Sequence, residues 1–404
     1  MNKLRTLAAG APTWDAWQQV VRTLDGLSLD EQQSAARAFN EASAHWPTTL
    51  NPWVGFDGLE GSELRRSPAH WVKEIYSGQH APKHSVLRII DSPRRPMGAQ
   101  KLENLLAPEA QIENARQVGF DQAKVTSGFL KAMKGDGAWR RWTALRLWTC
   151  DMKASGLKLL GAADLSALEM LNLEQNRMGE EGVKGLAKAP GLKSLTAVHL
   201  GSNRLDASAA AALGAMDWAQ RLTWLNLAAN QLHDPGLDLL TQGGMPALRE
   251  LDLSHNHVGQ STDAWSRGLP GLTALRMNNT NVTGEGLAAM LPNLPALDTL
   301  VLDATTVGDR GAEAIAAAPN RWKTLQLQDS DITPAGLAKV LASPSVEGVE
   351  RLVLGSGFDL ANAQRLIDGA CPRLRFLWWN GPELGEGVEK ALRADKRLAA
   401  TLPY

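Results

Sequence analysis

The sequence has little of what several protein classes require. Only two of its 404 residues are cysteines, Cys150 and Cys371, and they stand far apart in the chain. A disulfide scaffold and a four-cysteine zinc site are therefore excluded, and a reducing compartment, the cytoplasm, is expected. No run of about 18 apolar residues occurs, so no membrane span is expected. The short apolar stretch at residues 7–11 is too brief for the core of a signal peptide.

An excess of charge of either sign is also missing. Lysine and arginine number 42 and aspartate and glutamate 43, which leaves a formal net charge of -1. This balance removes the electrostatic case for a nucleic acid or an anionic membrane as a partner. The hydrophobic content of 44% is ordinary for a globular chain and too high for a disordered one. Aromatic residues are few, but 14 of them are tryptophans, so the positions of the tryptophans need an explanation.

One pattern recurs from residue 142 onward: Leu, two variable residues, Leu, one variable, Leu, two variable, Asn. It is most regular at 168–176, 195–203, 222–230 and 248–256. Looser copies begin at residues 142, 272, 297, 322, 349 and 374, with starts 24 to 27 residues apart, and two degenerate copies precede them at 84–92 and 112–120. About twelve units are therefore predicted over residues 84–404.

The spacing inside one unit indicates a short strand followed by a turn. The second and third apolar residues of the pattern alternate with one polar residue, which is the period of a strand with one buried face. An asparagine at the ninth position can bond backbone groups where the chain leaves the strand. The four residues predicted to form such a structural ladder are Asn176, Asn203, Asn230 and Asn256. Later units carry Thr280, Thr305 and Ser330 there, which bond more weakly.

The second half of each unit indicates a short helix, for example from residues 179, 234, 283, 309 and 333. This period and pattern resemble the leucine-rich repeat family, in particular its ribonuclease-inhibitor-like and cysteine-containing subclasses. The resemblance implies a right-handed α/β solenoid, with parallel strands on a concave face and helices on a convex face. Positions three, five, seven and eight of each unit face the concave side in that family.

Residues 1–83 do not fit the repeat and read as a helical N-terminal cap, with a separate functional domain as the alternative. Helices are expected from Thr13, with Trp17 on an apolar face, from the capping box Ser28–Glu31, and from Ser67-Pro68. A terminal repeat would otherwise expose its apolar edge to water, so a cap is needed.

The concave face supplies the candidate partner-binding residues. Trp148 and Trp224 are large aromatic residues among small and polar ones, as in binding hot spots, unless they are covered. An acidic row with one arginine runs down the face, which would suit a partner with basic and aromatic groups or would simply be solvated. The full set is Trp148, Glu174, His199, Trp224, Glu250, Asp252, His255, Arg276 and Asp303.

Chemistry-bearing motifs are absent. No glycine-rich phosphate loop or nucleophile elbow occurs, and the eight histidines are scattered. His255 and His257 flank Asn256 and should not converge, so no metal and no cofactor is predicted. We predict a monomeric, non-catalytic scaffold that binds a protein partner on the concave face. The alternative is a regulator of a partner enzyme, such as a GTPase-activating or inhibitor protein, because some family members act on small GTPases.

Overall fold

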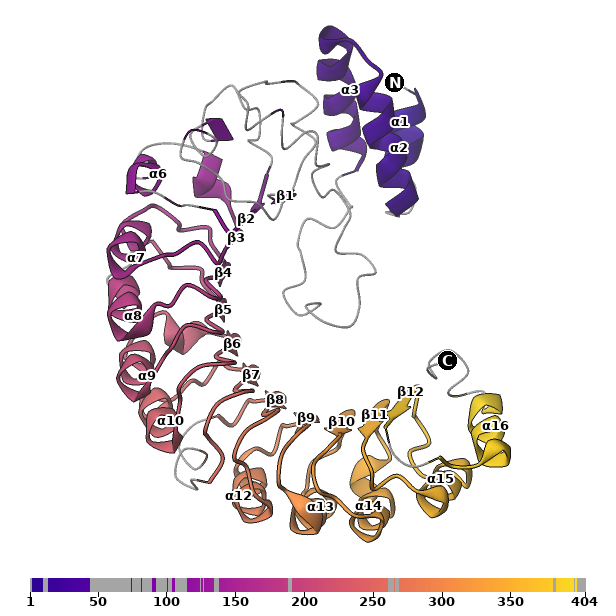
Figure 1. Ribbon diagram of the computed structural model, residues 1–404. Coiled ribbons are helices and arrows are strands. Elements are labelled where there is room, and N and C mark those ends of the chain that lie inside the picture. The colour runs from indigo at the N-terminus through magenta and orange to yellow at the C-terminus, as the bar shows by residue number, and fades with distance from the viewer. Residues whose placement is uncertain are drawn as a thin grey trace. The chain divides into compact units, whose positions relative to one another are not determined.

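Strands and helices alternate along most of the chain in the computed structural model (Figure 1). The structure describes residues 2–9, 14–43, 89–91, 115–123, 127–133, 138–187, 191–260, 269–380 and 383–395, together with the single positions 74, 81, 100, 104, 105, 125, 265 and 397. The chain divides into two compact units, Met1–His199 and Leu200–Tyr404. The domain boundary predicted between residues 83 and 84 lies outside the described residues.

Among the described residues of the first unit, five strands pair in parallel and in sequence order. They are β1 (Ile89–Asp91), β2 (Gln117–Asp121), β3 (Ala144–Trp148), β4 (Met170–Asn172) and β5 (Ala197–His199). Both degenerate copies of the repeat therefore carry a strand, as expected. The register places each apolar residue beside its counterpart in the next copy, for example Leu145 beside Leu171.

The described part of the second unit contains seven strands, again parallel and in sequence order. They are β6 (Trp224–Asn226), β7 (Glu250–Asp252), β8 (Ala274–Arg276), β9 (Thr299–Val301), β10 (Thr324–Leu327), β11 (Arg351–Leu354) and β12 (Phe376–Trp379). Short strands suffice here because strands of successive repeats pair with each other rather than with a distant segment.

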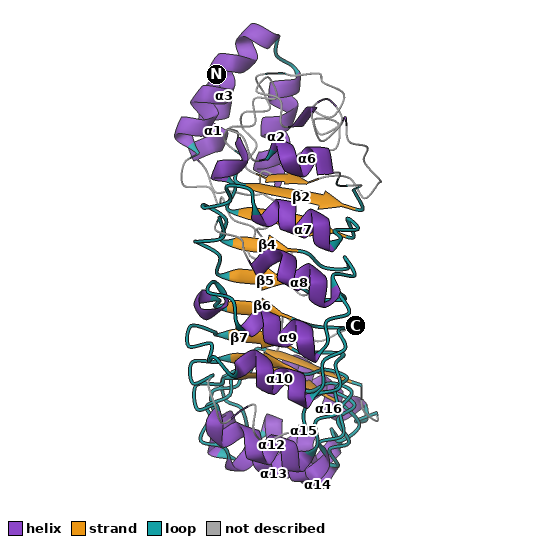
Figure 2. Cartoon of the chain, turned by 90° about the vertical axis from the view of Figure 1, so that its left-hand side faces the viewer, coloured by secondary structure: helices purple, strands orange, loops and turns teal. Residues whose placement is uncertain are grey.

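Helices connect the strands and lie on the opposite side of each unit from the open strand face (Figure 2). The first unit has α6 (Ser127–Ala132), α7 (Ala154–Gly161), α8 (Gly179–Ala187) and the 3₁₀ helix η3 (Ala138–Arg141). The second has α9 (Ala207–Gly214), α10 (Asp234–Thr241), α12 (Gly284–Met290), α13 (Gly308–Ala317), α14 (Pro334–Leu341), α15 (Leu360–Ile367), α16 (Glu386–Ala394), and the 3₁₀ helices η4 (Ala219–Arg221), η5 (Leu291–Asn293) and η6 (Pro344–Val346). The α/β repeat architecture predicted from the sequence is confirmed.

The apolar positions of the pattern form the core between strands and helices. From the copy at 142 to the copy at 349, the residues at positions one, four and six are at most 3% exposed. Trp142 and Trp322 replace leucines at position one and are fully buried. In the last copy, by contrast, Trp379 at position six is only partly buried and packs edge-on against Phe358, with 5.7 Å between the ring centres. The core is thus the stacked leucines, with tryptophan as an occasional replacement.

The N-terminal residues fold as helices. These are α1 (Asn2–Ala9), α2 (Trp14–Asp25) and α3 (Leu29–Ala42). Trp17 on α2 and Phe39 on α3 are fully buried, with ring centres 6.2 Å apart. The carboxylate of Glu31 accepts hydrogen bonds from the backbone N–H and the hydroxyl of Ser28. The helix predicted from Ser67-Pro68 lies outside the described residues.

Candidate partner-binding face

The ninth-position asparagines tie each turn to the neighbouring copy. Asn230 is buried, and its Oδ1 accepts hydrogen bonds from the backbone N–H groups of Asn203 (2.9 Å) and Leu205 (3.0 Å) in the preceding copy. Its Nδ2 donates to the carbonyls of Leu200 and Leu227. One side chain therefore satisfies backbone groups of two successive turns.

The same arrangement recurs in both units. Asn176 accepts from the N–H groups of Cys150 and Met152 and donates to the carbonyls of Leu147 and Leu173. Asn256 accepts from Leu232 and donates to Leu227 and Leu253, while Asn203 donates to the Gly201 carbonyl. Thr280, Thr305 and Ser330 each donate one bond, to the carbonyls of Met277, Leu302 and Leu327 of their own copies.

A second set of hydrogen bonds, at position seven, was not anticipated from the sequence. In the early copies the position-five side chain accepts from the position-seven N–H of its own copy: Asn172 from Glu174, Asn226 from Ala228, and Asp252 from Ser254. In the later copies the acceptor of the position-seven N–H is instead the position-seven side chain of the preceding copy. Ser254 accepts from the N–H of Asn278, Asn278 from that of Asp303, and Asp303 from that of Gln328. The later set is called the position-seven ladder below.

The ladder answers a requirement of the backbone. An N–H group that is turned away from water needs an acceptor. Position five supplies one where it is Asn or Asp, but in the later copies it is Arg276, Val301 and Gln326, none of which takes that role. Position seven is then Ser, Asn or Asp in the copy before. The sequence could have indicated the position-seven ladder through this pattern, in which a copy without Asn or Asp at position five follows a copy with Ser, Asn or Asp at position seven.

In the first unit, Glu174 and His199 lie together. Oε2 of Glu174 lies 3.6 Å from Nε2 of His199. Glu174 belongs to the copy of the repeat that contains β4, and His199 is the last residue of β5. Burial lowers the pKa of His199 to about 4, so the imidazole is neutral at pH 7 and the contact is not an ion pair there. Trp148, at the end of β3, is partly buried.

In the second unit, Trp224 is not the exposed aromatic residue that the sequence suggested. It is only 7% exposed. In a parallel sheet, residues at the same register lie about 4.8 Å apart on one face, and Glu250 on β7 is the register partner of Trp224. A large ring on such a face is flanked by side chains of adjacent strands, and this crowding is the physical reason for the error.

Glu250 and Arg276 pair across β7 and β8, and Asp252 on β7 is the register partner of Arg276. An oxygen of Glu250 lies 3.5 Å from Nη1 of Arg276. Burial raises the pKa of Glu250, and the arginine partly offsets that rise. Asp252 accepts from the side-chain amide of Asn226 at 3.2 Å as well as from the Ser254 backbone. These side chains are therefore held in place by their neighbours.

Further along the same face, Asp303 and Asp329 lie in successive copies. Burial raises the pKa of Asp303, the bond from the Gln328 N–H opposes this, and the charge of Asp329 adds to the rise. Asp329 is exposed and accepts from the side-chain amides of Gln328 (3.2 Å) and Asn380 (3.3 Å). The guanidinium of Arg351 lies 3.9 Å from the ring centre of Phe376.

His255 occupies position eight, where the chain turns. Its ring is exposed, and its Nδ1 lies 2.9 Å from the side-chain nitrogen of Asn279. Its φ is +58°, and the position-eight residues of most neighbouring copies also adopt this left-handed conformation, among them Ala229 and Asn279. The turn edge of the strand face therefore has a fixed backbone shape.

Four of the predicted partner-binding residues, Trp224, Glu250, Asp252 and His199, are divided between the two units. Three of these residues belong to the second unit and come together on β6 and β7. His199 belongs to the first unit, where its described neighbour is Glu174. The role of all these residues in binding stays a prediction.

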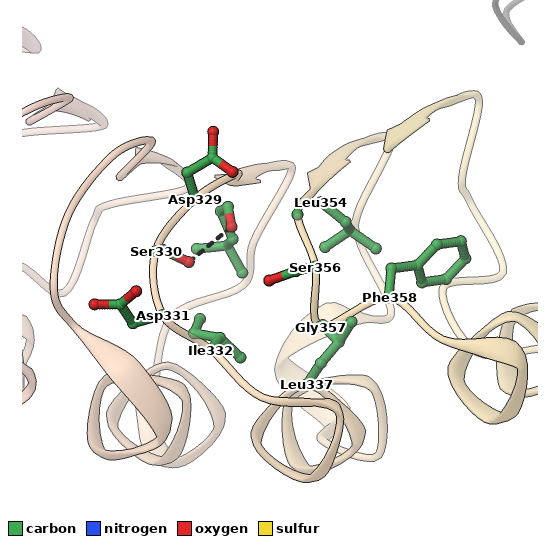
Figure 3. Close-up of a pocket in the computed structure, with 11 residues that line it drawn as sticks. Asp329, Ser330, Asp331, Ile332, Leu337, Leu354, Ser356, Gly357 and Phe358 are labelled. Atoms are coloured by element: carbon green, nitrogen blue, oxygen red, sulfur yellow. Dashed lines mark hydrogen bonds between the residues drawn. The ribbon is translucent and has the colours of Figure 1, made fainter. Parts of the chain in front are cut away.

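One crevice of about 10 Å³, barely the space of a single water molecule, lies between the copies of β10 and β11, and Figure 3 shows Asp329 and Asp331 directed away from it. Both cysteines are buried and neither forms a disulfide, and burial raises the pKa of Cys371 to about 12. Among the described residues, no three or more of His, Cys, Asp and Glu are grouped to hold a metal ion. None of the described helices has the length and apolarity to cross a membrane.

Comparison with known proteins identifies the repeat. Residues 245–261 match a family described as "Leucine Rich repeat". Fibromodulin of Sus scrofa is 30% identical over 124 residues, which cover 30% of this chain and 76% of that protein, and fibromodulin of Oryctolagus cuniculus matches to the same extent.

Two crystal structures are also similar. An internalin from Listeria monocytogenes matches with a TM-score of 0.47 and 15% identity over 83% of this chain and 94% of the other. The TLR13–ssRNA13 complex matches with a TM-score of 0.43 and 17% identity over 72% and 39%. With TM-scores below 0.5, neither structure bears on function. The subclass suggested by the sequence stays a prediction, but the fibromodulin match, the matched repeat and the observed α/β repeat together show that this chain belongs to the leucine-rich repeat family.

Proposed function

We propose that the chain is a non-catalytic scaffold that binds a protein partner, and that the strand face of the second unit carries the contact. The observation that supports this most is the way its polar side chains are held. Asp252 and Asp303 each accept a backbone N–H, and Glu250 is held by Arg276. Side chains that are ordered before binding lose little entropy on binding, which favours affinity.

The charge on this face indicates the partner's chemistry. Glu250, Asp252, Asp303 and Asp329 lie on it, against Arg276 and Arg351. Burial raises the pKa of Glu250 and of Asp303, because it disfavours the charged carboxylate. A positive group brought to either carboxylate would offset the free-energy cost of keeping that charge buried. A partner that presents lysine or arginine beside an aromatic residue fits best.

The remaining predictions from the sequence belong to the same proposal. Residues 1–83 serve as a cap over the apolar edge of the first repeat, and the protein works as a monomer in the cytoplasm. A regulator of a partner enzyme would use the same surface. Stimulation or inhibition of the captured partner's turnover would distinguish it from a passive scaffold.

The test is a matched pair of charge reversals in the second unit. Glu250→Lys changes the strand face, whereas Glu285→Lys makes the same change at an exposed position on α12. A partner captured with the wild-type chain and then purified is titrated against both variants, with thermal melts to verify folding. The proposal predicts a loss of affinity of roughly tenfold or more for Glu250→Lys and little change for Glu285→Lys. Equal affinity for both, or a loss only for Glu285→Lys, would refute it.

A further inference from the structure

Two histidines from successive copies lie face to face outside the strand face. His233 is the residue before α10, and His257 follows Asn256, the ninth-position asparagine of its copy. Their backbones form an isolated parallel bridge, and the N–H of His257 donates to the carbonyl of Leu232 at 2.9 Å. The rings are stacked, with centres 5.2 Å apart and planes inclined by 16°. Both side chains are exposed.

We propose that His233 and His257 form a two-ligand site for a late first-row divalent metal ion, such as Zn²⁺ or Cu²⁺. Imidazole nitrogens bind such ions at about 2.0–2.1 Å, and two imidazoles on one tetrahedral ion have ring centres about 5 Å apart. The observed separation already has this value. Nitrogen lone pairs lie in the ring planes, so in the stacked arrangement they do not meet at one point, and the proposed site requires each exposed ring to rotate about its Cβ–Cγ bond.

The surrounding residues hold the pair together. The carboxylate of Asp234, next to His233, accepts from the N–H groups of Gly259 (2.7 Å) and Gln260 (3.2 Å). Together with the backbone bridge, these bonds fix the two loops to each other, so the second imidazole is presented at a high effective concentration once the first has bound.

The site offers two protein ligands, because the Asp234 carboxylate is occupied by the backbone. Water fills the other positions on the ion. Imidazole ligands favour Zn²⁺, Cu²⁺ and Ni²⁺, whereas Mg²⁺ and Ca²⁺ require oxygen donors. Protons compete with a metal for imidazole nitrogens, so binding weakens in acid.

The experiment measures Zn²⁺ binding to the full chain by calorimetry at pH 7.5, in parallel with His233→Gln, His257→Gln and the control His255→Gln. His255 is also exposed, and its ring contacts Asn279. Each variant lacks a single histidine, so a loss of binding that occurs only in the His233 and His257 variants is assigned to the pair. Melts in a chelator verify that each variant folds.

Each single substitution at the pair should weaken one Zn²⁺ site by roughly tenfold or more, and His255→Gln should leave it unchanged. The double variant should lose little beyond either single variant, and Mg²⁺ should not compete. Cu²⁺ bound to the wild type should give an electron paramagnetic resonance spectrum with two coupled nitrogens. Equal Zn²⁺ affinity in wild type and both variants, or weakening by only one of the two substitutions, would overturn the proposal.

Discussion

The copies with asparagine at position nine and the copies with threonine or serine there differ in what the ninth side chain bonds. Asn230 makes two bonds to the preceding copy's N–H groups, as well as bonds to carbonyls on both sides. Thr305 makes a single bond, within its own copy. Where the ninth-position link between copies ends, the position-seven ladder from Ser254 to Gln328 begins.

The comparison teaches that the need for hydrogen-bond acceptors comes from the backbone N–H groups of the turns, and that side chains at more than one position can meet it. Each turn presents N–H groups that need acceptors. The N–H at position seven is bonded from position five of its own copy or from position seven of the preceding copy, whereas the N–H groups of Asn203 and Leu205 are bonded from position nine of the next copy. In the second unit the ladder also fixes Asp303 on the strand face. The residues that close the turns and the residues proposed to meet a partner are therefore in part the same.

The largest effect is expected at the asparagine copies. Asn230→Ala leaves the buried N–H groups of Asn203 and Leu205 without their acceptor, and each such group costs about 1–3 kcal/mol. We expect the free energy of unfolding to fall by about 4 kcal/mol, measured by denaturant titration. A loss of less than about 1 kcal/mol would show that water can replace the asparagine.

A smaller effect is expected within the ladder. Asp303→Ala removes the acceptor of a single N–H, that of Gln328, and should cost about 1–2 kcal/mol. Asp303→Asn keeps an acceptor oxygen at the same place and should cost less. If both substitutions are equally harmful, the charge of Asp303 matters and its hydrogen bond does not.

The smallest stability change is expected at Thr305. Its hydroxyl donates to one carbonyl of its own copy, so Thr305→Val should cost at most about 1 kcal/mol. Thermal melts beside Asn230→Ala would measure the contrast. A cost at Thr305 that equals the cost at Asn230 would erase the distinction between the two kinds of copy.

The pH dependence of the free energy of unfolding tests the role of Asp303 in the position-seven ladder. Burial raises the pKa of Asp303 in the folded chain, so the folded state binds the proton more tightly than the unfolded state does. The stabilising contribution of the protonated group is complete below the unfolded pKa and is lost as pH rises through the folded pKa. Relative to Asp303→Asn, the wild type should therefore gain stability as the solution is acidified through that range. The opposite slope in paired denaturant titrations would mean that the folded pKa is lowered.

The sequence predicts the architecture well because its signal is local and repeated. The leucines at fixed spacing and the helices that start near residues 179, 234, 283, 309 and 333 appear where they were expected. The burial of Trp224 was missed, because it depends on how neighbouring side chains crowd one face. The pairing of His233 and His257 was missed too, because these residues lie 24 positions apart and outside the nine-residue pattern.

The central claim is that side chains at positions nine and seven hold the turns of the strand face by accepting from different backbone N–H groups. Residue-resolved hydrogen exchange on Asn230→Ala and Asp303→Ala tests it most directly. The account predicts faster exchange at the amides of Asn203 and Leu205 in the first variant and at the amide of Gln328 in the second, with neither variant affecting the other's amides. Unchanged protection at these amides, or loss of protection at all three in both variants, would contradict it.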